Sequence, residues 1–407
     1  MDQNLSLVSL PAKIPQLVLL RDVTKHLKRG HLWVFKDCFE AKQKFSSGVV
    51  ELIHKKDSLG FAVFQEDTQL TCRVLFLNDD AHTRKNNQAL TFKLWSQNNW
   101  KRALTLRSHF PSKETNSYRL INGEGDGFCG LNIDIYADTA VIKHDHPIME
   151  KIWNHQLLVE WLRRDLPFLN CVYLKRRNHE EEKGENLFGE LKDEVLFLEN
   201  SVTFASNIRD AAKTGFFLDQ RDNRLLIKNF SKDKHVLNLF SYTGGFSLFA
   251  AFGGALSATS VDISKAAIKA SERNFEVNNL STKHTAVAMD AFDFVDLKLK
   301  EKIKYDLVIA DPPSFAPNQK AIPQAIEAYT RVFSQALKLV KPGGLFAASS
   351  CSSHITYDVF MDICLNAFSK SNKRARVVYL GAQPTDHPYP LMMTELRYLK
   401  FILFEVE

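Results

Sequence analysis

The feature that most constrains the fold is a regular alternation of strand-like and helical segments from about residue 201 to the C-terminus. Short apolar runs predict strands at 235–240, 258–261, 286–289, 305–310 and 345–350. Helical patterns fall between them, at 246–252, 264–278 and 325–339, and two β-rich runs at 376–380 and 398–406 close the chain. Strands and helices in alternation predict an α/β fold with a parallel, doubly wound, Rossmann-like sheet.

The first 200 residues follow a different pattern. Short strands at roughly ten-residue spacing predict a small β-barrel over residues 15–82. Expected helices at 90–109 and 148–164 and strands at 131–136 and 171–174 predict a small central α+β domain, for which we set the limits 88–200. The charged segment 179–186 reads as an exposed loop. The α/β domain then covers residues 201–407.

Composition excludes several classes of protein. With 45% hydrophobic and 25% charged residues, the 407-residue chain is expected to fold rather than to be disordered or fibrous. We find no apolar run of about 18 residues and no basic segment at Met1–Asn4, so we expect neither a membrane span nor a secretory signal, and a cytoplasmic protein. The six cysteines are scattered without a CxxC pair, so no metal and no disulfide framework is expected.

Basic residues are concentrated near the N-terminus. Between positions 21 and 56 there are nine basic and four acidic residues, the basic ones being Arg21, Lys25, Lys28, Arg29, Lys36, Lys42, Lys44, Lys55 and Lys56. Such an excess attracts a phosphate backbone, although a solvated lysine-rich face explains it as well. We predict that Arg29, Lys36 and Trp33 contact RNA, with burial of Trp33 in the barrel core as the alternative.

Three acidic or glycine-rich positions follow the first strands of the α/β region, where open sheets bind ligands. The turn from Asn238 to Phe246 contains Gly244, and a glycine lets a ligand approach the backbone, although tight packing explains it equally. Asp262 ends the next strand and suits the two hydroxyls of a ribose. Asp290 follows the third strand and is either a contact to adenine or a helix cap. Together they indicate a nucleoside cofactor.

Two later strand ends carry groups suited to chemistry on a base. Asp311 is followed by two prolines, which stiffen the loop and leave carbonyl groups free to contact a flat polar substrate. Cys351 lies just past an apolar strand, and its thiolate would be a nucleophile. Cys171 and Cys364 fit inert core positions, and His354 is either a partner of the thiol or a capping or solvated residue.

One further segment is highly specific. Residues 213–224, KTGFFLDQRDNR, together with the strand ends above, resemble class I S-adenosylmethionine-dependent methyltransferases, and within them the family of the 23S ribosomal RNA large-subunit methyltransferase I, which makes 5-methylcytosine. Residues 115–127 resemble that family's central domain, and 30–35 its N-terminal PUA domain, an RNA-binding barrel. Residues 386–388 and 398–400 resemble its C-terminal end.

The resemblance implies a cofactor, a partner and site residues. The cofactor would be S-adenosylmethionine, and the partner ribosomal RNA, either free 23S RNA or the assembling large subunit. The residues implied to hold the cofactor are Phe217, Gln220, Arg221, Asn238, Phe240, Ser241, Gly244, Asp262, Ile263, Ser264, Asp290, Ala291, Phe292 and Asp311. Cys351 and Asp311 would be catalytic, and Pro312 and Pro313 would contact the RNA. The sequence departs from the family at Ala211-Ala212 and Phe128-Cys129, neither of which touches this chemistry.

These residues predict a reaction and leave two alternatives. Cys351 would attack carbon 6 of a flipped cytosine, which makes carbon 5 able to accept a methyl group. Methylation of a purine nitrogen is the first alternative, but its usual loop has an aromatic residue directly after the two prolines, where this chain has Ser314, with Phe315 one residue later. The second alternative is an RNA-binding factor without catalytic activity.

Overall fold

The computed structural model describes residues 6–39, 46–66, 68–80, 87–176 and 184–407. The chain divides into two compact units. The first comprises residues 1–195 together with the segments 207–216 and 386–394. The second comprises residues 196–206, 217–385 and 395–407. Each unit is built around its own sheet or sheets.

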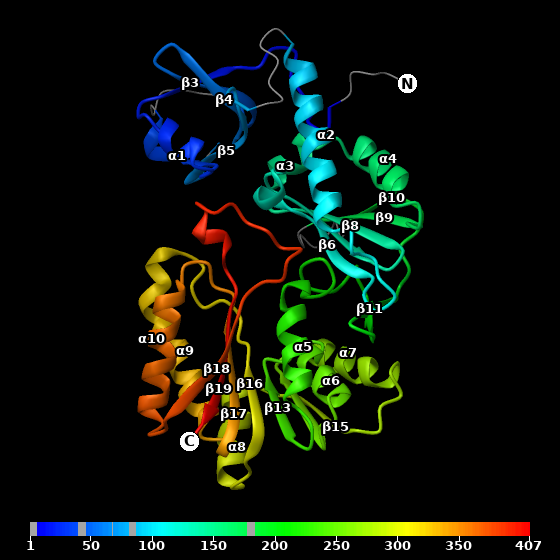
Figure 1. Ribbon diagram of the computed structural model, residues 1–407, viewed down its shortest axis with the longest axis vertical. Coiled ribbons are helices and arrows are strands. Elements are labelled where there is room, and N and C mark those ends of the chain that lie inside the picture. The colour runs from blue at the N-terminus through cyan, green and yellow to red at the C-terminus, as the bar shows by residue number, and fades with distance from the viewer. Residues whose placement is uncertain (1–5, 40–45, 67, 81–86, 177–183) are drawn as a thin grey trace. The chain divides into compact units, whose positions relative to one another are not determined.

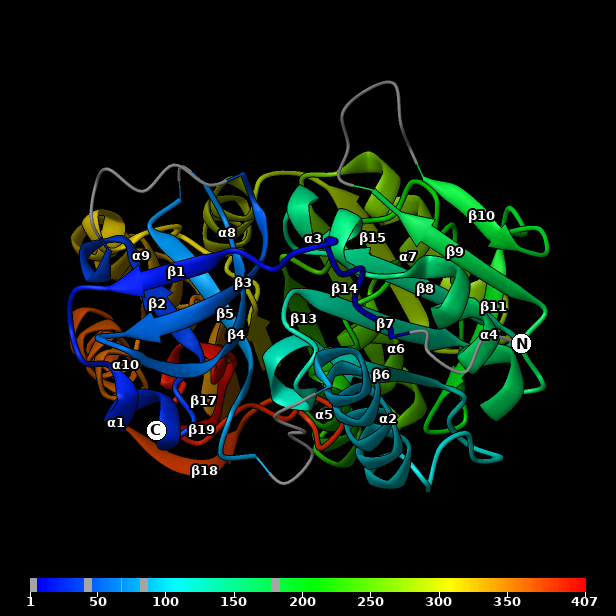
Figure 2. The ribbon, with the colours of Figure 1, turned by 90° about the horizontal axis from the view of Figure 1, so that it is seen from above.

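The first sheet of the first unit has five strands in the order β1-β3-β4-β5-β2, with β1 parallel to β3 and the other pairs antiparallel. Its elements are β1 (Gln16–Leu19), α1 (Thr24–Lys28), β2 (Trp33–Phe35), η1 (Lys36–Cys38), β3 (Gly48–His54), β4 (Asp57–Phe64) and β5 (Leu70–Leu77). Strands β3, β4 and β5 lie side by side in Figure 1 and Figure 2. An isolated bridge between Leu19 and Phe39 joins one edge strand to the chain that follows the other, so the sheet curls towards closure.

The second sheet has the order β10-β9-β8-β7-β6 and packs against helices. Its elements are α2 (Gln88–Leu106), β6 (Ser117–Asn122), η2 (Gly123–Asp126), β7 (Leu131–Tyr136), β8 (Thr139–His144), α3 (Pro147–Ile152), α4 (His155–Asp165), β9 (Cys171–Lys175) and β10 (Glu185–Phe188). Side chains of both sheets share one apolar core, in which the ring of Trp95 lies 5.6 Å from Phe76 and 6.3 Å from Trp153.

Two expectations for this unit are corrected. The helix expected over 148–164 is two helices, because Trp153 has an extended backbone and Asn154 begins α4, its side chain accepting a hydrogen bond from the Leu157 amide at 3.0 Å. Part of the loop expected at 179–186 is a strand, since β10 begins at Glu185. The rest of that loop, up to residue 183, lies outside the described residues.

The second unit contains a seven-stranded sheet of order β15-β14-β13-β16-β17-β19-β18. Its strands are β13 (His235–Leu239), β14 (Ser257–Asp262), β15 (Lys283–Ala288), β16 (Tyr305–Ala310), β17 (Val340–Ser350), β18 (Ala375–Gly381) and β19 (Lys400–Val406). Its helices are η3 (Leu218–Gln220), α5 (Arg221–Asn229), α6 (Gly245–Phe252), α7 (Lys265–Glu276), α8 (Ala291–Lys300), η4 (Gln319–Ala321), α9 (Ile322–Leu337), α10 (Tyr357–Lys370) and η5 (Thr394–Leu396). A two-stranded sheet of β11 (Val195–Glu199) and β12 (Val202–Ser206) precedes them.

Alternate residues of the central strands face opposite layers of helices. Val236, Leu307 and Leu345 are paired across three strands and pack with α5 and α6. The next residues, such as Leu237 and Val308, pack with α8, α9 and α10, and α9 and α10 lie together in Figure 1. This two-sided burial explains why the strands read as continuous apolar runs.

The expected doubly wound sheet is present, with two differences. Strand β19 lies antiparallel between β17 and β18, whereas the alternation of strands and helices had suggested parallel strands throughout. The Lys341–Gly344 segment, expected only to end a helix, is a bulge within β17: the register passes from Tyr305 paired with Val340 to Leu307 paired with Leu345.

Candidate active site

The turn after β13 is shaped by left-handed backbone conformations. Phe240, Tyr242 and Gly244 have φ of 58°, 46° and 75°. A Cβ atom at Gly244 would lie 2.1 Å from the hydroxyl oxygen of Ser271 in α7, so only glycine fits here without displacing α7. The sequence left ligand approach and tight packing open, and the structure shows tight packing at this glycine.

Three buried polar atoms around this turn have no hydrogen-bond partner among the described residues. They are the Asn238 side-chain oxygen and the hydroxyl oxygens of Ser241 and Thr243. The amide nitrogen of Asn238 is used, since it donates to Ser247 at 3.1 Å. Buried polar atoms are nearly always satisfied, so three in one turn indicate a place for a polar ligand.

Asp262 lies at the end of β14, the strand next to β13. Its carboxylate accepts hydrogen bonds from the backbone amides of Tyr242 at 2.8 Å and Ser264 at 2.9 Å, one on each oxygen. Each oxygen keeps lone pairs for a further donor. Ser264 also caps α7, as the sequence predicted, and the side chain of Ile263 between them is 75% exposed.

Asp290 has the role of a helix cap. One of its carboxylate oxygens accepts the backbone amides of Phe292 at 2.8 Å and Asp293 at 3.4 Å. Ala291 is buried, and the Phe292 ring lies beneath the Arg331 guanidinium, 4.7 Å from the ring centre. Of the two possibilities left open for Asp290, the structure shows the cap, and a contact to adenine stays a prediction.

Asp311 follows β16, and the side chain of Gln220 connects it to the next strand. The Gln220 amide nitrogen donates to the Asp311 carboxylate and to the Ser349 hydroxyl, both at 3.0 Å. The Gln220 side-chain oxygen accepts from Asn223 at 2.6 Å. Gln220 therefore links the carboxyl ends of β16 and β17.

The other predicted residues of the 213–224 motif lie close to the same strands. Phe217 places its ring edge-on against Tyr242, 5.1 Å between centres. Arg221, the first residue of α5, is buried with its guanidinium 3.7 Å from the Asp222 carboxylate.

Cys351 is half-buried directly after β17, next to the loop that follows β16. The hydroxyl of Tyr329 from α9 connects the two loops: it accepts from Ser350 at 3.0 Å, pairs with Ser352 at 2.8 Å and donates to the Pro313 carbonyl at 3.3 Å. Ser352 also pairs with Ser314 at 2.8 Å. Pro312 is buried and Pro313 is exposed.

The other predicted cysteine positions behave as core residues. Cys171 and Cys364 are buried, and burial raises the pKa of the Cys171 thiol to about 11 and that of the Cys364 thiol above any physiological value. The expectation of inert core cysteines at these two positions is confirmed.

The sequence reading missed two residues next to Cys351. Tyr329 lies in a helix whose apolar face predicts only packing, so nothing local marks its hydroxyl. Lys400 did leave a signal: it is a buried lysine directly before a run of four buried apolar residues.

The predicted RNA contacts lie in and beside the first sheet of the first unit: Trp33 is in β2, Arg29 follows α1, and Lys36 begins η1. Arg29 and Lys36 are exposed, and Lys42 and Lys44 lie outside the described residues. Trp33 is half-buried; its indole donates to Glu124 at 2.8 Å, and Glu124 also accepts from Arg73 at 3.1 Å. Trp33 thus has a structural role in joining the two sheets of its unit.

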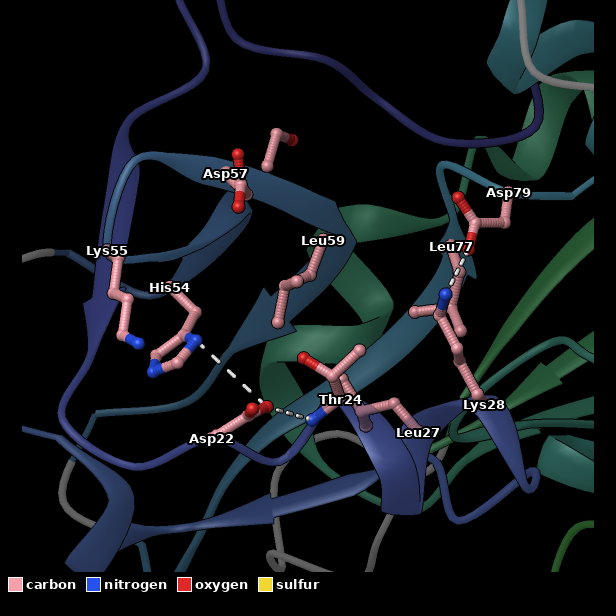
Figure 3. Close-up of a pocket in the computed structure, with 11 residues that line it drawn as sticks. Asp22, Thr24, Leu27, Lys28, His54, Lys55, Asp57, Leu59, Leu77 and Asp79 are labelled. Atoms are coloured by element: carbon pink, nitrogen blue, oxygen red, sulfur yellow. Dashed lines mark hydrogen bonds and ion pairs between the residues drawn. The ribbon is translucent and has the colours of Figure 1, made fainter.

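A pocket of about 400 Å³ lies on the same sheet (Figure 3). It is lined by acidic and basic side chains in similar number, among them Asp22, Asp57, Asp79, Lys28 and Lys55. Lys28 pairs with Asp79 at 2.5 Å, and His54 lies 4.0 Å from Asp22. Because its charges are balanced, this pocket is not a distinct phosphate site.

No helix in the part of the chain that the structure describes is both long and apolar enough to cross a membrane. Over the same residues, no group of three or more histidine, cysteine and carboxylate side chains is arranged to hold a metal ion.

The strand order, the antiparallel β19 and the turn after β13 define a class I S-adenosylmethionine-dependent methyltransferase. The family model described as S-adenosylmethionine-dependent methyltransferase matches residues 169–375. A ribosomal RNA large subunit methyltransferase of Deinococcus radiodurans is 32% identical, covering 94% of this chain and 95% of that protein. The ribosomal RNA large subunit methyltransferase I of Pseudoalteromonas atlantica is 30% identical, covering 94% and 97%. The chain belongs to the family of these ribosomal RNA large subunit methyltransferases.

Solved structures agree with this assignment. The crystal structure of SMU.776, a methyltransferase complexed with SAH, has a TM-score of 0.83 at 28% identity and covers 96% of this chain and 100% of that one. A SAM-dependent methyltransferase from Streptococcus mutans has a TM-score of 0.82 at 27% identity, with the same coverage.

Proposed function

We propose that this protein methylates carbon 5 of a cytosine in 23S ribosomal RNA, through a covalent adduct with Cys351. One observation carries the proposal: three adjacent strands end in three complementary groups. Strand β13 ends in the turn with unsatisfied polar atoms, β16 in Asp311, and β17 in Cys351. A methyl donor, a polar contact to a base and a nucleophile are the three parts that the reaction requires.

The residues present fit the cofactor. Asp262 would accept the two ribose hydroxyls, because its carboxylate is already oriented by two backbone amides. Asn238, Ser241 and Thr243 offer buried polar atoms that lack partners among the described residues. The exposed Ile263 would lie against the adenine ring, with Ala291 and Phe292 at its far edge and Phe240 and Gly244 along the turn. S-adenosylmethionine supplies an electrophilic methyl group on a sulfonium.

The chain's residues would then act on the base in order. The Cys351 thiolate forms a bond to carbon 6, and the electron pair of the carbon 5–carbon 6 double bond moves into the ring, towards nitrogen 3. Asp311 and the Pro312 carbonyl hold the polar edge of the base, where a protonated nitrogen 3 favours this attack. Carbon 5 would then take the methyl group, with S-adenosylhomocysteine as the leaving group. The carbon 5 proton would leave to solvent, the carbon 5–carbon 6 double bond would re-form, and the carbon 6–sulfur bond would break to regenerate the Cys351 thiolate.

Two features favour cytosine over a purine nitrogen. Cys351 has no use in nitrogen methylation, because an amine or ring nitrogen is itself the nucleophile. Ser314, in the position where an aromatic residue would stack on a purine, is instead committed to a hydrogen bond with Ser352.

RNA binding is assigned to two places. Pro313, exposed beside Cys351, would contact the flipped nucleotide together with Pro312. Arg29 and Lys36, exposed beside the first sheet, would contact the phosphate backbone, and Trp33 the adjoining nucleotide. We propose the N-terminal sheet, residues 15–82, as a PUA-like RNA-binding barrel, with a central domain over 88–200 and the methyltransferase domain over 201–407.

The decisive experiment replaces the thiol. Cys351→Ala should lose methylation of ribosomal RNA from a strain lacking the enzyme and retain binding of S-adenosylmethionine. Cys38→Ala, which changes another half-buried cysteine, is the matched control and should keep full activity. Methylation by Cys351→Ala at the wild-type rate would refute the covalent mechanism.

A second experiment tests the base. RNA that contains 5-fluorocytosine should trap the wild-type enzyme as a complex stable to denaturation, because fluorine at carbon 5 cannot leave as a proton does. Cys351→Ala should form no such complex. Mass mapping of the methylated product identifies the nucleotide, and a methyl group on a purine would contradict the proposal.

A further inference from the structure

Lys400 is a buried lysine near the proposed nucleophile, Cys351. The proposed reaction gives Lys400 no role. Its side chain is 1% exposed, and on β19 it lies directly opposite Ser350, the residue before Cys351. Its ammonium donates to the carbonyl of Ser352, the residue after Cys351, at 2.6 Å, and to the carbonyl of Tyr398 at 2.8 Å. Lys400 thus contacts Ser352, which follows Cys351, and lies opposite Ser350, which precedes it.

This lysine is still mostly charged at neutral pH, although its surroundings lower its pKa. Burial lowers the pKa of Lys400 to about 8; the nearby Cys351 acts in the opposite direction, and the positive charge of Arg397 adds to the lowering. The other titratable groups at this loop are the Tyr329 hydroxyl from α9 and Asp219, whose carboxylate accepts from Tyr398 at 2.7 Å. Among the described residues, no carboxylate forms an ion pair with Lys400.

The Lys400 ammonium is held by backbone carbonyls and, within the described part of the chain, by no carboxylate, which is an energetically costly arrangement. Removing such a charge from water is unfavourable, and carbonyl oxygens compensate only in part. A methionine would fill the same space without that cost. A nearby thiolate would be the missing counter-charge, and Cys351 lies between Ser350, which is opposite Lys400, and Ser352, whose carbonyl Lys400 contacts.

We propose that Lys400 is a positioning residue for the nucleophile: it fixes the loop around Cys351 and provides the positive charge that favours the thiolate. This inference rests on the proposed role of Cys351. The thiol proton leaves to solvent and Lys400 stays protonated, so the pair becomes an ammonium and a thiolate. The same charge favours departure of the thiolate from carbon 6 at the end of the reaction.

Alkylation of Cys351 tests this without relying on turnover. Iodoacetamide reacts with the thiolate, and mass spectrometry of the peptide containing Cys351 measures the rate separately from the other cysteines. In Lys400→Met we expect alkylation at pH 7 to be about tenfold slower, since tenfold corresponds to one pKa unit. Lys400→Arg keeps the charge and should lie between Lys400→Met and wild type. Equal rates in wild type and Lys400→Met would overturn the inference.

Two further measurements keep the outcomes distinct. If Lys400→Met does not fold, the wild-type protein and glutathione are alkylated in parallel over a range of pH. A midpoint of the alkylation rate against pH that is lower for Cys351 than for glutathione supports the inference. A midpoint at or above that of glutathione overturns it. The proposed reaction fails instead if Cys351→Ala methylates RNA normally. In that case a slower alkylation in Lys400→Met would still establish the charge effect.

Discussion

The N-terminal sheet β1–β5 and the C-terminal sheet β13–β19 differ in how far their polar side chains are exposed to solvent. Around the N-terminal sheet several charges are at the surface and pair with each other: Arg21 with Asp37 at 2.7 Å and Lys28 with Asp79 at 2.5 Å, all four side chains more than half exposed. At the strand ends of the C-terminal sheet, polar groups are buried or half-buried, and three side-chain atoms of one turn lack a partner among the described residues.

This difference in exposure determines what kind of ligand each region can bind. Exposed charges are screened by salt and contribute little individually, so the N-terminal sheet suits a long polyanion that touches many of them. Buried polar atoms in fixed positions select a ligand by its shape and its hydrogen bonds. Substitutions should therefore have large, specific effects in the C-terminal sheet and small, salt-dependent effects in the N-terminal one.

The largest effect is expected at the turn after β13. Gly244→Val places a side chain where φ is 75° and where the Cβ would lie 2.1 Å from Ser271, so the turn or α7 must shift. We expect the affinity for S-adenosylmethionine, measured by calorimetry, to fall about a hundredfold, which is within the strain range for such positions. Gly343→Ala is the control: it has φ of 70° but open space around the Cβ, and should leave the affinity unchanged.

The next effect concerns turnover rather than cofactor binding. Tyr329→Phe removes the hydroxyl that connects Ser350, Ser352 and the Pro313 carbonyl, and so loosens Cys351 relative to the Asp311 loop. We expect kcat to fall about tenfold, because displacement of reacting groups by an ångström can cost more than that. The affinity for S-adenosylmethionine should stay the same.

Tyr357→Phe is the matched control for Tyr329→Phe, because the Tyr357 hydroxyl is buried without a hydrogen-bond partner among the described residues. It should leave kcat unchanged. If both variants lose turnover equally, general destabilisation of this region explains the loss and the connecting role of Tyr329 is wrong.

The sequence predicted the C-terminal sheet well because burial on both faces leaves long apolar runs. The strand at Tyr305–Ala310 was predicted with the bounds that the structure shows, and Ser264 was predicted as the cap of its helix. The antiparallel direction of β19 could not be predicted, since an apolar run has no direction. It depends on the chain returning to pair with β17, a long-range contact.

Prediction of the site succeeded for residues at strand ends and failed for residues that reach the site from elsewhere. Asp262 and Cys351 follow strands, so topology alone gathers them at one edge of the sheet. Gln220 was predicted from a resemblance as a cofactor contact, and its bonds to Asp311 and Ser349 became visible only in three dimensions. Lys400 stands out in the sequence as a lysine before an apolar run, but its bonds to the carbonyls of Ser352 and Tyr398 became visible only in three dimensions.

A smaller effect is expected for RNA binding on the N-terminal sheet. The double variant Arg29→Ala, Lys36→Ala removes two exposed charges and should weaken binding of ribosomal RNA severalfold. The slope of log affinity against log salt should fall by about 1.4, at about 0.7 per phosphate contact on single strands. Lys269→Ala, an exposed lysine of α7, is the control, and binding of S-adenosylmethionine should not change in either variant. An unchanged salt slope would remove the N-terminal sheet from the RNA interface.

The smallest effect is a dependence of the free energy of unfolding on pH, which is expected from the partly buried His284. His284 in β15 stacks on Phe275 at 3.7 Å and its ring lies 3.0 Å from the Ser260 hydroxyl; burial lowers the pKa of His284 to about 4. Because this is below the value of about 6.5 expected in the unfolded chain, the unfolded state binds more protons between the two values, and stability is lost as pH falls below about 6.5. Urea unfolding at pH 7 and pH 5 should show a loss of about 1 kcal/mol from this residue, allowing for the part of the ring that water reaches. His284→Asn should lack that part of the pH dependence, and an identical dependence in both proteins would show that the ring is already solvated.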